Sequence, residues 1–283
     1  MILKELVKKH TERLRSLKIE SARLDVEIII SNYFKIDRSE IFLQENRIIS
    51  GPDLTEIESE FSRREAGEPV AYIVGRRDFY KETFIIRPGV LVPRPETELI
   101  VEEALLWIKN RSNLNILDLG CGSGCIGLSL IKEAPGNHLL GIDISAAAIE
   151  LSLLNAKKLK IESSCQFIQT NVLDLKAELV NLVVANPPYL DETDASIDRK
   201  TLNFEPKEAL YSKELGFFDV KEWLKKSAEL LLPSGLLLME IGYDQGDLVR
   251  KFLTDNRLFS EFEILKDLSG LERVVRARKE QQR

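Results

Sequence analysis

From residue 115 onward, short apolar segments with the composition of strands alternate with segments of helical character. This alternation predicts a mostly parallel sheet with helices on both faces, because parallel neighbours must be joined by a long crossover. The expected strands are residues 115–119, 138–143, 165–169, 181–185, 235–241, 261–265 and 272–278. The expected helices are residues 124–133, 146–159, 173–179, 219–231 and 245–255.

The last two expected strands are separated only by residues 266–271, which are too few for a parallel crossover. We therefore expect these two strands to pair antiparallel, as a hairpin at or near one edge of the sheet. The predicted fold class is α/β, a doubly wound, mostly parallel seven-stranded sheet with an antiparallel edge hairpin.

Two further segments precede this domain. Residues 1–75 have helical spacing of apolar residues, including a helix over 54–66 that ends at Gly67, and predict a small helical domain. We expect this domain to dock a substrate, because the glycine-rich loop and the polar strand ends described below all lie after residue 115. Residues 76–95 contain strand formers around a turn at Lys81-Glu82 and predict a linking hairpin. A helix is expected from Pro95 to about residue 109, within a domain of residues 96–283.

Composition excludes several classes of protein. The formal net charge of -6 argues against a protein that binds long duplex DNA, and we expect no stable nucleic-acid binding. No apolar run approaches the ~18 residues needed to cross a bilayer, and the N-terminal segment is charged from its start, so we expect a cytoplasmic protein without membrane contact. Three cysteines without a CxxC pair argue against a disulfide scaffold or a metal site.

The first strand of the alternation runs into a glycine-rich loop, Asp118-Leu-Gly-Cys-Gly-Ser-Gly124. Glycines there let the backbone turn tightly and approach a ligand, which in such sheets binds beyond the carboxyl ends of the strands. Asp143 ends the second strand, where a carboxylate can accept both hydroxyls of a ribose. Asn171 follows the third strand, where an amide can reach an adenine edge. The three features predict an adenosine pocket.

Two adenosine cofactors compete for this pocket. Gly122-x-Gly124-x-x-Gly127 formally matches the dinucleotide fingerprint, but it begins two residues after Gly120 has already ended the strand. Asp118 also lies just before the glycines, and a carboxylate suits a cationic ligand better than a pyrophosphate. S-adenosyl-L-methionine, which carries a sulfonium and an ammonium group, is therefore the predicted cofactor.

The fourth strand ends in Asn186-Pro187-Pro188-Tyr189, the most specific motif of the chain. The Asn186 side-chain oxygen and the Pro187 carbonyl are two acceptors that suit the two hydrogens of a planar NH2 group. Tyr189 adds an aromatic face against which such a group can lie. This motif predicts methyl transfer to an amide or an exocyclic amine.

The reaction does not require a strong base, because the sulfonium is already a strong electrophile and positioning supplies much of the acceleration. His10 and His138, the two histidines, lie outside the motif loops. We expect His10 to be a surface residue of a helix and His138 to begin a strand.

Four segments together resemble the release-factor glutamine methyltransferases, also called the HemK or PrmC family. They are Val92-Pro-Arg-Pro-Glu-Thr-Glu98, the loop 118–124, the motif 186–189, and Phe204-Glu-Pro206 with Ala209-Leu210. The resemblance covers nearly the whole chain and implies a class I methyltransferase sheet with S-adenosyl-L-methionine as cofactor. It implies methylation at N5 of the Gln in the Gly-Gly-Gln loop of class I peptide chain release factors.

Carried over to this sequence, the resemblance implies the site residues. The cofactor-binding positions are Asp118, Leu119, Gly120, Cys121, Gly122, Asp143, Asn171, Val172 and Asn186. The catalytic and substrate-binding positions are Asn186, Pro187, Pro188 and Tyr189. Many relatives have an acid and an aromatic where this chain has Asn171 and Val172. Glu205 lies in a long polar segment, residues 190–215, that we expect to contact the substrate.

Alternative functions fit part of the pattern. N5-glutamine methylation of a ribosomal protein would use the same site. N6-adenine methylation of nucleic acid shares the Asn-Pro-Pro-Tyr motif, but the chain lacks a sizeable basic region for a flipped base. A NAD-dependent oxidoreductase would leave residues 186–189 without a role.

Overall fold

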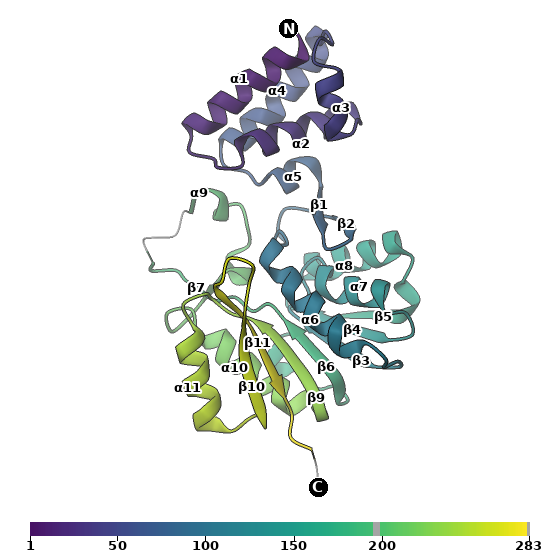
Figure 1. The fold of residues 1–283 in the computed structure, drawn as a ribbon, viewed down its shortest axis with the longest axis vertical. Coiled ribbons are helices and arrows are strands. Elements are labelled where there is room, and N and C mark those ends of the chain that lie inside the picture. Colours follow the sequence, from purple (N-terminus) through teal and green to yellow (C-terminus); the bar gives the residue numbers. More distant parts are fainter. Residues whose placement is uncertain (195–198, 282–283) are drawn as a thin grey trace. The chain divides into compact units, whose positions relative to one another are not determined.

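The computed structural model describes residues 1–194 and 199–281 (Figure 1). These residues form two compact units, one of residues 1–76 with 199–204 and the other of residues 77–194 with 205–281. Within the described ranges, no helix combines the length and the apolar character needed to cross a membrane.

The first unit is helical. Its elements are α1 (Leu3–Ser16), α2 (Ala22–Phe34), α3 (Arg38–Leu43), α4 (Gly51–Glu65), α5 (Val70–Val74) and α9 (Arg199–Leu202). Its core is built from fully buried side chains such as Leu6, Ile29 and Phe61. Helix α4 begins before the expected residue 54, because the Ser50 hydroxyl caps it by accepting the N–H of Asp53.

His10 is fully buried in α1, so the expectation of a surface position is wrong. Its ring stacks on Phe61 with 3.8 Å between centroids, and its Nε2 lies 3.2 Å from Glu58 Oε1. Burial lowers the pKa of His10 although Glu58 opposes the shift. His10 lies on the same face of α1 as the buried Leu3 and Leu6, because positions 3, 6 and 10 have helical spacing. His10 is therefore buried because this face packs into the core.

A two-stranded sheet of β1 (Arg76–Phe79) and β2 (Glu82–Ile85) follows where the chain passes into the second unit. It is shorter than the expected hairpin, since residues 86–94 have no regular secondary structure. A 3-10 turn, η1 (Pro95–Thr97), then leads into α6 (Glu98–Ile108).

The main sheet has the seven predicted strands, in the order β10-β11-β9-β6-β3-β4-β5. They are β3 (Asn115–Leu119), β4 (His138–Asp143), β5 (Cys165–Gln169), β6 (Val180–Ala185), β9 (Leu231–Glu240), β10 (Glu261–Lys266) and β11 (Glu272–Arg278). Strand β11 is antiparallel to both β9 and β10, which confirms the edge hairpin. The chain order reverses between β3 and β6, and such a reversal is where open α/β sheets bind ligands.

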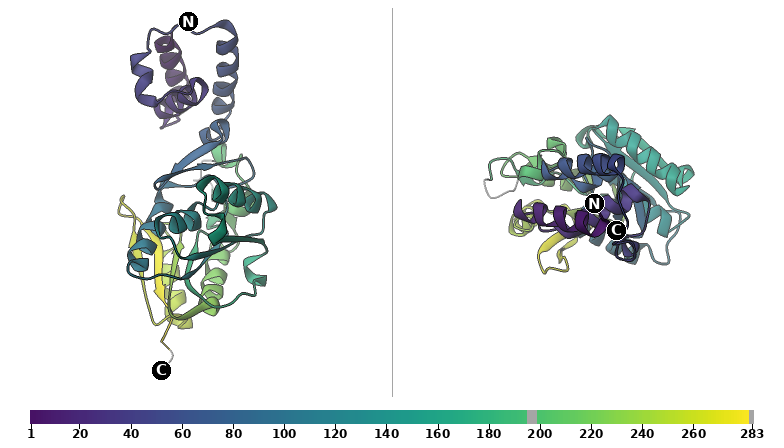
Figure 2. Two further views of the ribbon diagram at one scale, coloured as in Figure 1. Left: turned by 90° about the vertical axis from the view of Figure 1, so that its right-hand side faces the viewer. Right: turned by 90° about the horizontal axis from the view of Figure 1, so that it is seen from above.

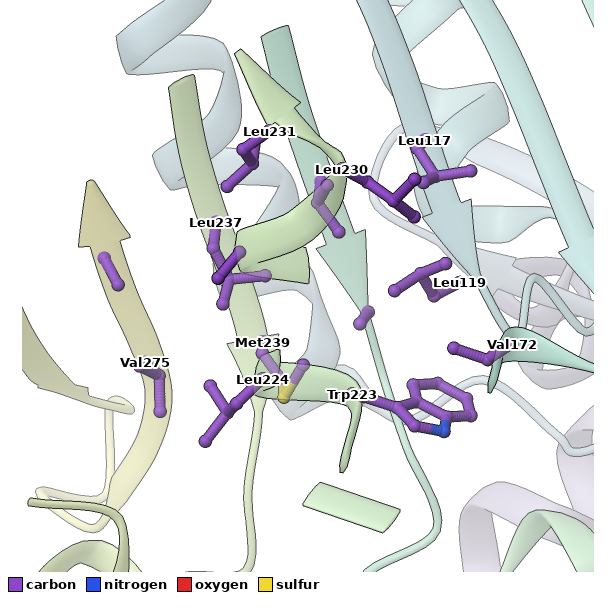
Figure 3. Close-up of a cluster of buried hydrophobic side chains, with 14 of the residues drawn as sticks. Leu117, Leu119, Val172, Trp223, Leu224, Leu230, Leu231, Leu237, Met239 and Val275 are labelled. Carbon is purple, nitrogen blue, oxygen red and sulfur yellow. The ribbon is translucent and has the colours of Figure 1, made fainter. Parts of the chain in front are cut away.

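Helices cover both faces of this sheet (Figure 1 and Figure 2). Helices α6, α7 (Cys125–Glu133) and α8 (Ala146–Leu159) contact one another and the strands on one face. Helices α10 (Phe218–Leu230) and α11 (Gly246–Asn256) pack on the other. Figure 3 shows Trp223 and Leu224 of α10 against Leu117, Leu119 and Met239 of the strands.

The helix expected at residues 173–179 is absent. In its place a 3-10 turn, η3 (Val172–Asp174), is followed by residues without regular structure that lead to β6. Val172 and Leu175 are buried in the core beneath α10. The segment thus serves as a short connection that buries two side chains.

The long segment 190–215 contains short elements. Strand β7 (Leu190–Asp191) pairs parallel with β8 (Tyr211–Ser212), and η4 (Lys207–Ala209) precedes β8. Residues 195–198 of this segment lie outside the described residues. A last short turn, η2 (Glu162–Ser164), precedes β5.

Candidate active site

A cavity of about 590 Å³ opens at the carboxyl ends of β3, β4, β5 and β6. Its volume lies in the range of small-molecule sites. Of the expected site residues, the wall includes Gly120, Cys121, Gly122, Asp143, Asn171, Val172, Asn186 and Pro188. Further wall residues come from 89–97, 123–126, 144–148 and 206–223, among them Thr97, Glu208, Lys213, Asp219 and Trp223. The topology therefore brings the predicted loop and strand ends together in one place.

The glycine loop owes its path partly to close packing. Gly120 has φ +67°, and a Cβ added there would lie 2.6 Å from the Trp223 ring. The loop is anchored on β4, because Cys121 N donates to the Ile142 carbonyl and Gly122 N donates to Asp143 Oδ2. Gly120 is thus required by the protein's own packing as well as by any ligand.

Asp118 and Leu119 are fully buried and do not belong to the cavity wall. Asp118 Oδ2 accepts the N–H of Gly127 at 2.9 Å, which ties the end of β3 to α7. Its Oδ1 has no hydrogen-bond partner among the described residues. Burial raises the pKa of Asp118 to about 7, with a smaller contribution in the same direction from Asp143. Asp118 therefore lies behind the glycine loop and supports it, and its side chain does not line the cavity.

Asp143 lines the cavity at the end of β4. Its Oδ1 accepts the N–H of Ser145, and its Oδ2 accepts the N–H of Gly122, each at 2.9 Å. Burial raises the pKa of Asp143, although these N–H groups favour the ionised form. Each carboxylate oxygen retains a second lone pair, which is the arrangement needed to accept a pair of ribose hydroxyls.

Asn171 and Val172 form the wall after β5. Asn171 Oδ1 accepts the N–H of Leu173 at 2.8 Å and caps η3. The side-chain Nδ2 is thus the donor that Asn171 can offer to a ligand, such as a ring nitrogen of adenine. Val172 is buried and supplies an apolar surface.

The Asn-Pro-Pro-Tyr motif directly follows β6. Asn186 and Pro188 line the cavity, whereas Pro187 and Tyr189 do not. Asn186 Nδ2 donates to Thr97 Oγ1 at 3.3 Å. Tyr189 donates its hydroxyl to Glu240 Oε1 at 2.9 Å, and burial raises its pKa well above the usual range. The motif is therefore fixed by side chains from two distant segments.

Glu240, which supports this site from outside the cavity wall, was not predicted from the sequence. It ends β9 and is almost completely buried, and burial raises its pKa. Its Oε2 accepts the Thr97 hydroxyl at 2.6 Å. The sequence offers one signal, which is an acid at the end of the apolar run Leu236–Met239.

Glu205, an expected substrate-binding residue, is also absent from the cavity wall. Its side chain is buried and pairs with Arg94, with 2.6 Å between Oε2 and Nη2. The pair ties the segment 190–215 to the segment before α6. The neighbouring Pro206 and Glu208 do reach the wall.

The charges of the wall favour a cationic ligand. Its described acidic residues are Asp143, Glu208 and Asp219, against the single base Lys213. The apolar surface of Val90, Ile126 and Val172 suits a flat base. With the acceptor pair on Asp143 and the donor on Asn171, these residues fit S-adenosyl-L-methionine.

Two family models match the chain. The PrmC N-terminal domain matches residues 5–75, and the methyltransferase small domain matches residues 97–204. The first match covers most of the helical unit. The second covers the glycine loop, Asp143 and the Asn-Pro-Pro-Tyr motif.

Curated relatives match over nearly the full chain. The release factor glutamine methyltransferase of Koribacter versatilis is 33% identical over 285 residues, which cover 99% of each chain. That of Vibrio cholerae is 37% identical over 254 residues, which cover 88% of this chain and 87% of the relative.

A solved structure supports the fold. A 16S rRNA methyltransferase of T. thermophilus, solved with AdoMet and guanosine, is 18% identical with a TM-score of 0.51. The match covers 70% of this chain and 47% of that one. At this identity the likeness concerns the fold alone.

Proposed function

Because the chain belongs to the release factor glutamine methyltransferase family, we propose that it methylates N5 of the Gln in the Gly-Gly-Gln loop of class I release factors. One observation carries this proposal. Asn186 lines the cofactor cavity while its Nδ2 is bound to Thr97, and its Oδ1 has no partner among the described residues. That oxygen is an acceptor for one hydrogen of a substrate NH2 group.

The cofactor is S-adenosyl-L-methionine, which when bound supplies an electrophilic methyl group on a sulfonium. Asp143 accepts the ribose hydroxyls, and Asn171 donates through Nδ2 to the adenine edge. The loop from Gly120 to Gly122 lets the backbone approach the ligand. Asp118 holds the end of β3 against α7 beneath that loop.

The substrate amide is held by Asn186 Oδ1 and the Pro187 carbonyl, one acceptor for each N–H. Holding both hydrogens directs the nitrogen lone pair toward the methyl carbon. With S-adenosyl-L-methionine bound, methyl transfer to the amide nitrogen would leave the thioether S-adenosylhomocysteine, and one N–H proton would pass to solvent. Tyr189, which lies outside the cavity wall, holds the motif in place through its hydroxyl bond to Glu240.

The helical unit of residues 1–75 is proposed to dock the release factor, with residues 76–95 as the linking hairpin and 96–283 as the methyltransferase domain. Phe42, Leu43 and Ile48 support this role, since they are 77%, 79% and 80% exposed. Scattered exposed apolar side chains are ordinary, but three large ones within seven residues of the chain favour a protein-binding surface. Deleting the unit should raise KM for the release factor and leave cofactor binding unchanged.

The function is tested with labelled S-adenosyl-L-methionine and purified substrates. We expect label on an intact release factor, and a mass gain of one methyl group on the peptide that contains the Gly-Gly-Gln sequence. A factor with Gln→Ala in that loop is the matched control and should remain unlabelled. Label on a ribosomal protein or on adenine-containing DNA, with none on the factor, would overturn the proposal.

A further inference from the structure

Asn186, the first residue of the Asn-Pro-Pro-Tyr motif, is linked to two buried side chains, Thr97 and Glu240, from distant parts of the second unit. Thr97 lies in η1, Asn186 follows β6 and Glu240 ends β9. Thr97 Oγ1 is 2.6 Å from Glu240 Oε2 and 3.3 Å from Asn186 Nδ2. Thr97 and Glu240 are each 1% exposed, so water does not compete for these bonds.

The direction of each hydrogen bond follows from what the groups can do. The two carboxyl oxygens of Glu240 each take one hydroxyl, since Thr97 donates to Oε2 and Tyr189 donates to Oε1. Once the Thr97 proton points to Glu240, the Thr97 oxygen can serve Asn186 only as an acceptor. Asn186 must then present Nδ2 to Thr97 and keep Oδ1 for the cavity.

The opposite orientation of the amide would harm substrate binding. An Asn186 turned by half a rotation would point its NH2 group at the substrate NH2 group, donor against donor. The two orientations are nearly equal in shape, so packing alone discriminates poorly between them. The hydrogen bonds from Thr97 to Glu240 and from Asn186 to Thr97 have one direction, and this direction selects the amide orientation in which Oδ1 faces the cavity.

We propose that Thr97 and Glu240 are positioning residues that set the orientation of the Asn186 amide for methyl transfer. This proposal rests on the proposed function, because it assumes that Asn186 Oδ1 accepts from a substrate NH2 group. Neither residue needs to touch the reacting atoms. Their effect on the reaction passes through Asn186.

The first variant is Thr97→Val, which keeps the branched shape and removes the hydroxyl. We expect the single-turnover rate with saturating cofactor and release factor to fall about tenfold, the scale of one buried hydrogen bond. The dissociation constant of the cofactor should stay within about twofold, because its expected partners are Asp143 and Asn171. Thr97→Ser restores the hydroxyl and should restore most of the rate.

The second variant is Glu240→Gln, which keeps the shape and removes the charge. Its NH2 group must face either Tyr189 or Thr97. When it faces Thr97 it donates, and the Thr97 hydroxyl can then donate to Asn186 Oδ1 and turn the amide. We expect a rate loss similar to that of Thr97→Val. Ser129→Ala, which removes a buried hydroxyl of α7, is the matched control and should keep the wild-type rate.

A structural role is separated from a positioning role by combining variants. In an Asn186→Ala background Thr97→Val should slow the reaction no further, because the residue through which it acts is gone. An equal additional loss in that background would overturn the proposal, as would a Thr97→Val enzyme with the wild-type rate. If the wild-type protein itself failed to methylate a release factor, the proposed function would be wrong instead.

Discussion

Arg94 and Glu205 form an ion pair with 2.6 Å between Nη2 and Oε2, although 111 residues separate them in the chain. Glu205 is buried with its Oε1 unpartnered among the described residues, whereas the Arg94 side chain is 33% exposed. Burial raises the pKa of Glu205 more than Arg94 lowers it. The buried Glu205 carboxylate therefore needs the ion pair more than the partly exposed Arg94 guanidinium does.

Removing Arg94 should cost more stability than neutralising Glu205. Arg94→Met leaves a buried carboxylate without a partner, and we expect a loss of about 2 kcal/mol in the free energy of unfolding. Glu205→Gln leaves the half-exposed Arg94 able to reach water and should cost less. Lowering the pH should shrink the Arg94→Met loss, because a protonated Glu205 is no longer charged. Equal losses in urea unfolding of the two variants would contradict this account.

The contact between Gly120 and Trp223 predicts a specific cost for an added methyl group. Gly120→Ala places a side chain at φ +67° and 2.6 Å from the Trp223 ring. Gly136→Ala is the matched control, with φ +88° and open space around the Cβ. We expect Gly120→Ala to lower the free energy of unfolding by about 1–3 kcal/mol more than Gly136→Ala, the usual range for overpacking. Thermal unfolding of both variants measures the difference.

Asp143 should carry a large part of the cofactor affinity. Asp143→Ala removes the acceptor for two ribose hydroxyls, and we expect binding to weaken by about 2–4 kcal/mol. Asp255→Ala, an exposed carboxylate on α11, is the control and should bind normally. Calorimetric titration with S-adenosyl-L-methionine measures both. Unchanged affinity of Asp143→Ala would remove the ribose assignment.

Much of the site could be predicted because its residues sit at strand ends. Asp143 ends one strand and Asn186 follows another, and parallel topology brings such ends together whatever the intervening sequence. The Gly120 loop could be recognised for the same reason. These features depend on local patterns that a single sequence carries.

The supporting contacts could not be predicted, because they join residues without any local pattern. Glu240 lies 143 positions from Thr97, and nothing near either residue indicates the other. The buried Glu205 looks like any polar residue of a long loop until its partner Arg94 is located. The expected helix at 173–179 failed for a related reason, since burial of Leu175 in the core outweighed local helix propensity.

Asp118 should make the free energy of unfolding depend on pH, and the substitution Asp118→Asn should remove that dependence. Its pKa in the folded protein is about 7, above the unfolded value of about 4. The folded state therefore holds the proton more tightly, and this contribution is present at low pH and is lost as the pH rises through 7. Asp118→Asn keeps an oxygen for the Gly127 N–H and cannot titrate.

We expect the stability difference between Asp118→Asn and wild type to shift in favour of the variant between about pH 4 and pH 7, by roughly 3 kcal/mol. Asp143, Glu205 and Glu240 also have raised pKa values, but they are common to both proteins and largely cancel in the difference. Urea unfolding across this range measures the shift. A difference that does not change with pH would contradict the assigned pKa.

Asn186 should control the chemical step more than cofactor binding. Asn186→Ala removes the acceptor for one substrate hydrogen and lets the amide rotate, and we expect kcat to fall about 100- to 1,000-fold. Asn186→Asp keeps an acceptor of similar shape but adds a negative charge near the sulfonium. That charge stabilises the cation before transfer, and the cation is neutralised during transfer, so this variant should also be slow.

Cofactor affinity should change much less, because most of the adenosine contacts are expected on β3, β4 and β5. Single-turnover methylation of a release factor with saturating cofactor measures the rates. If Asn186→Ala kept near-normal turnover, residues 186–189 would be only a turn, and methylation of an NH2 group would lose its main structural support.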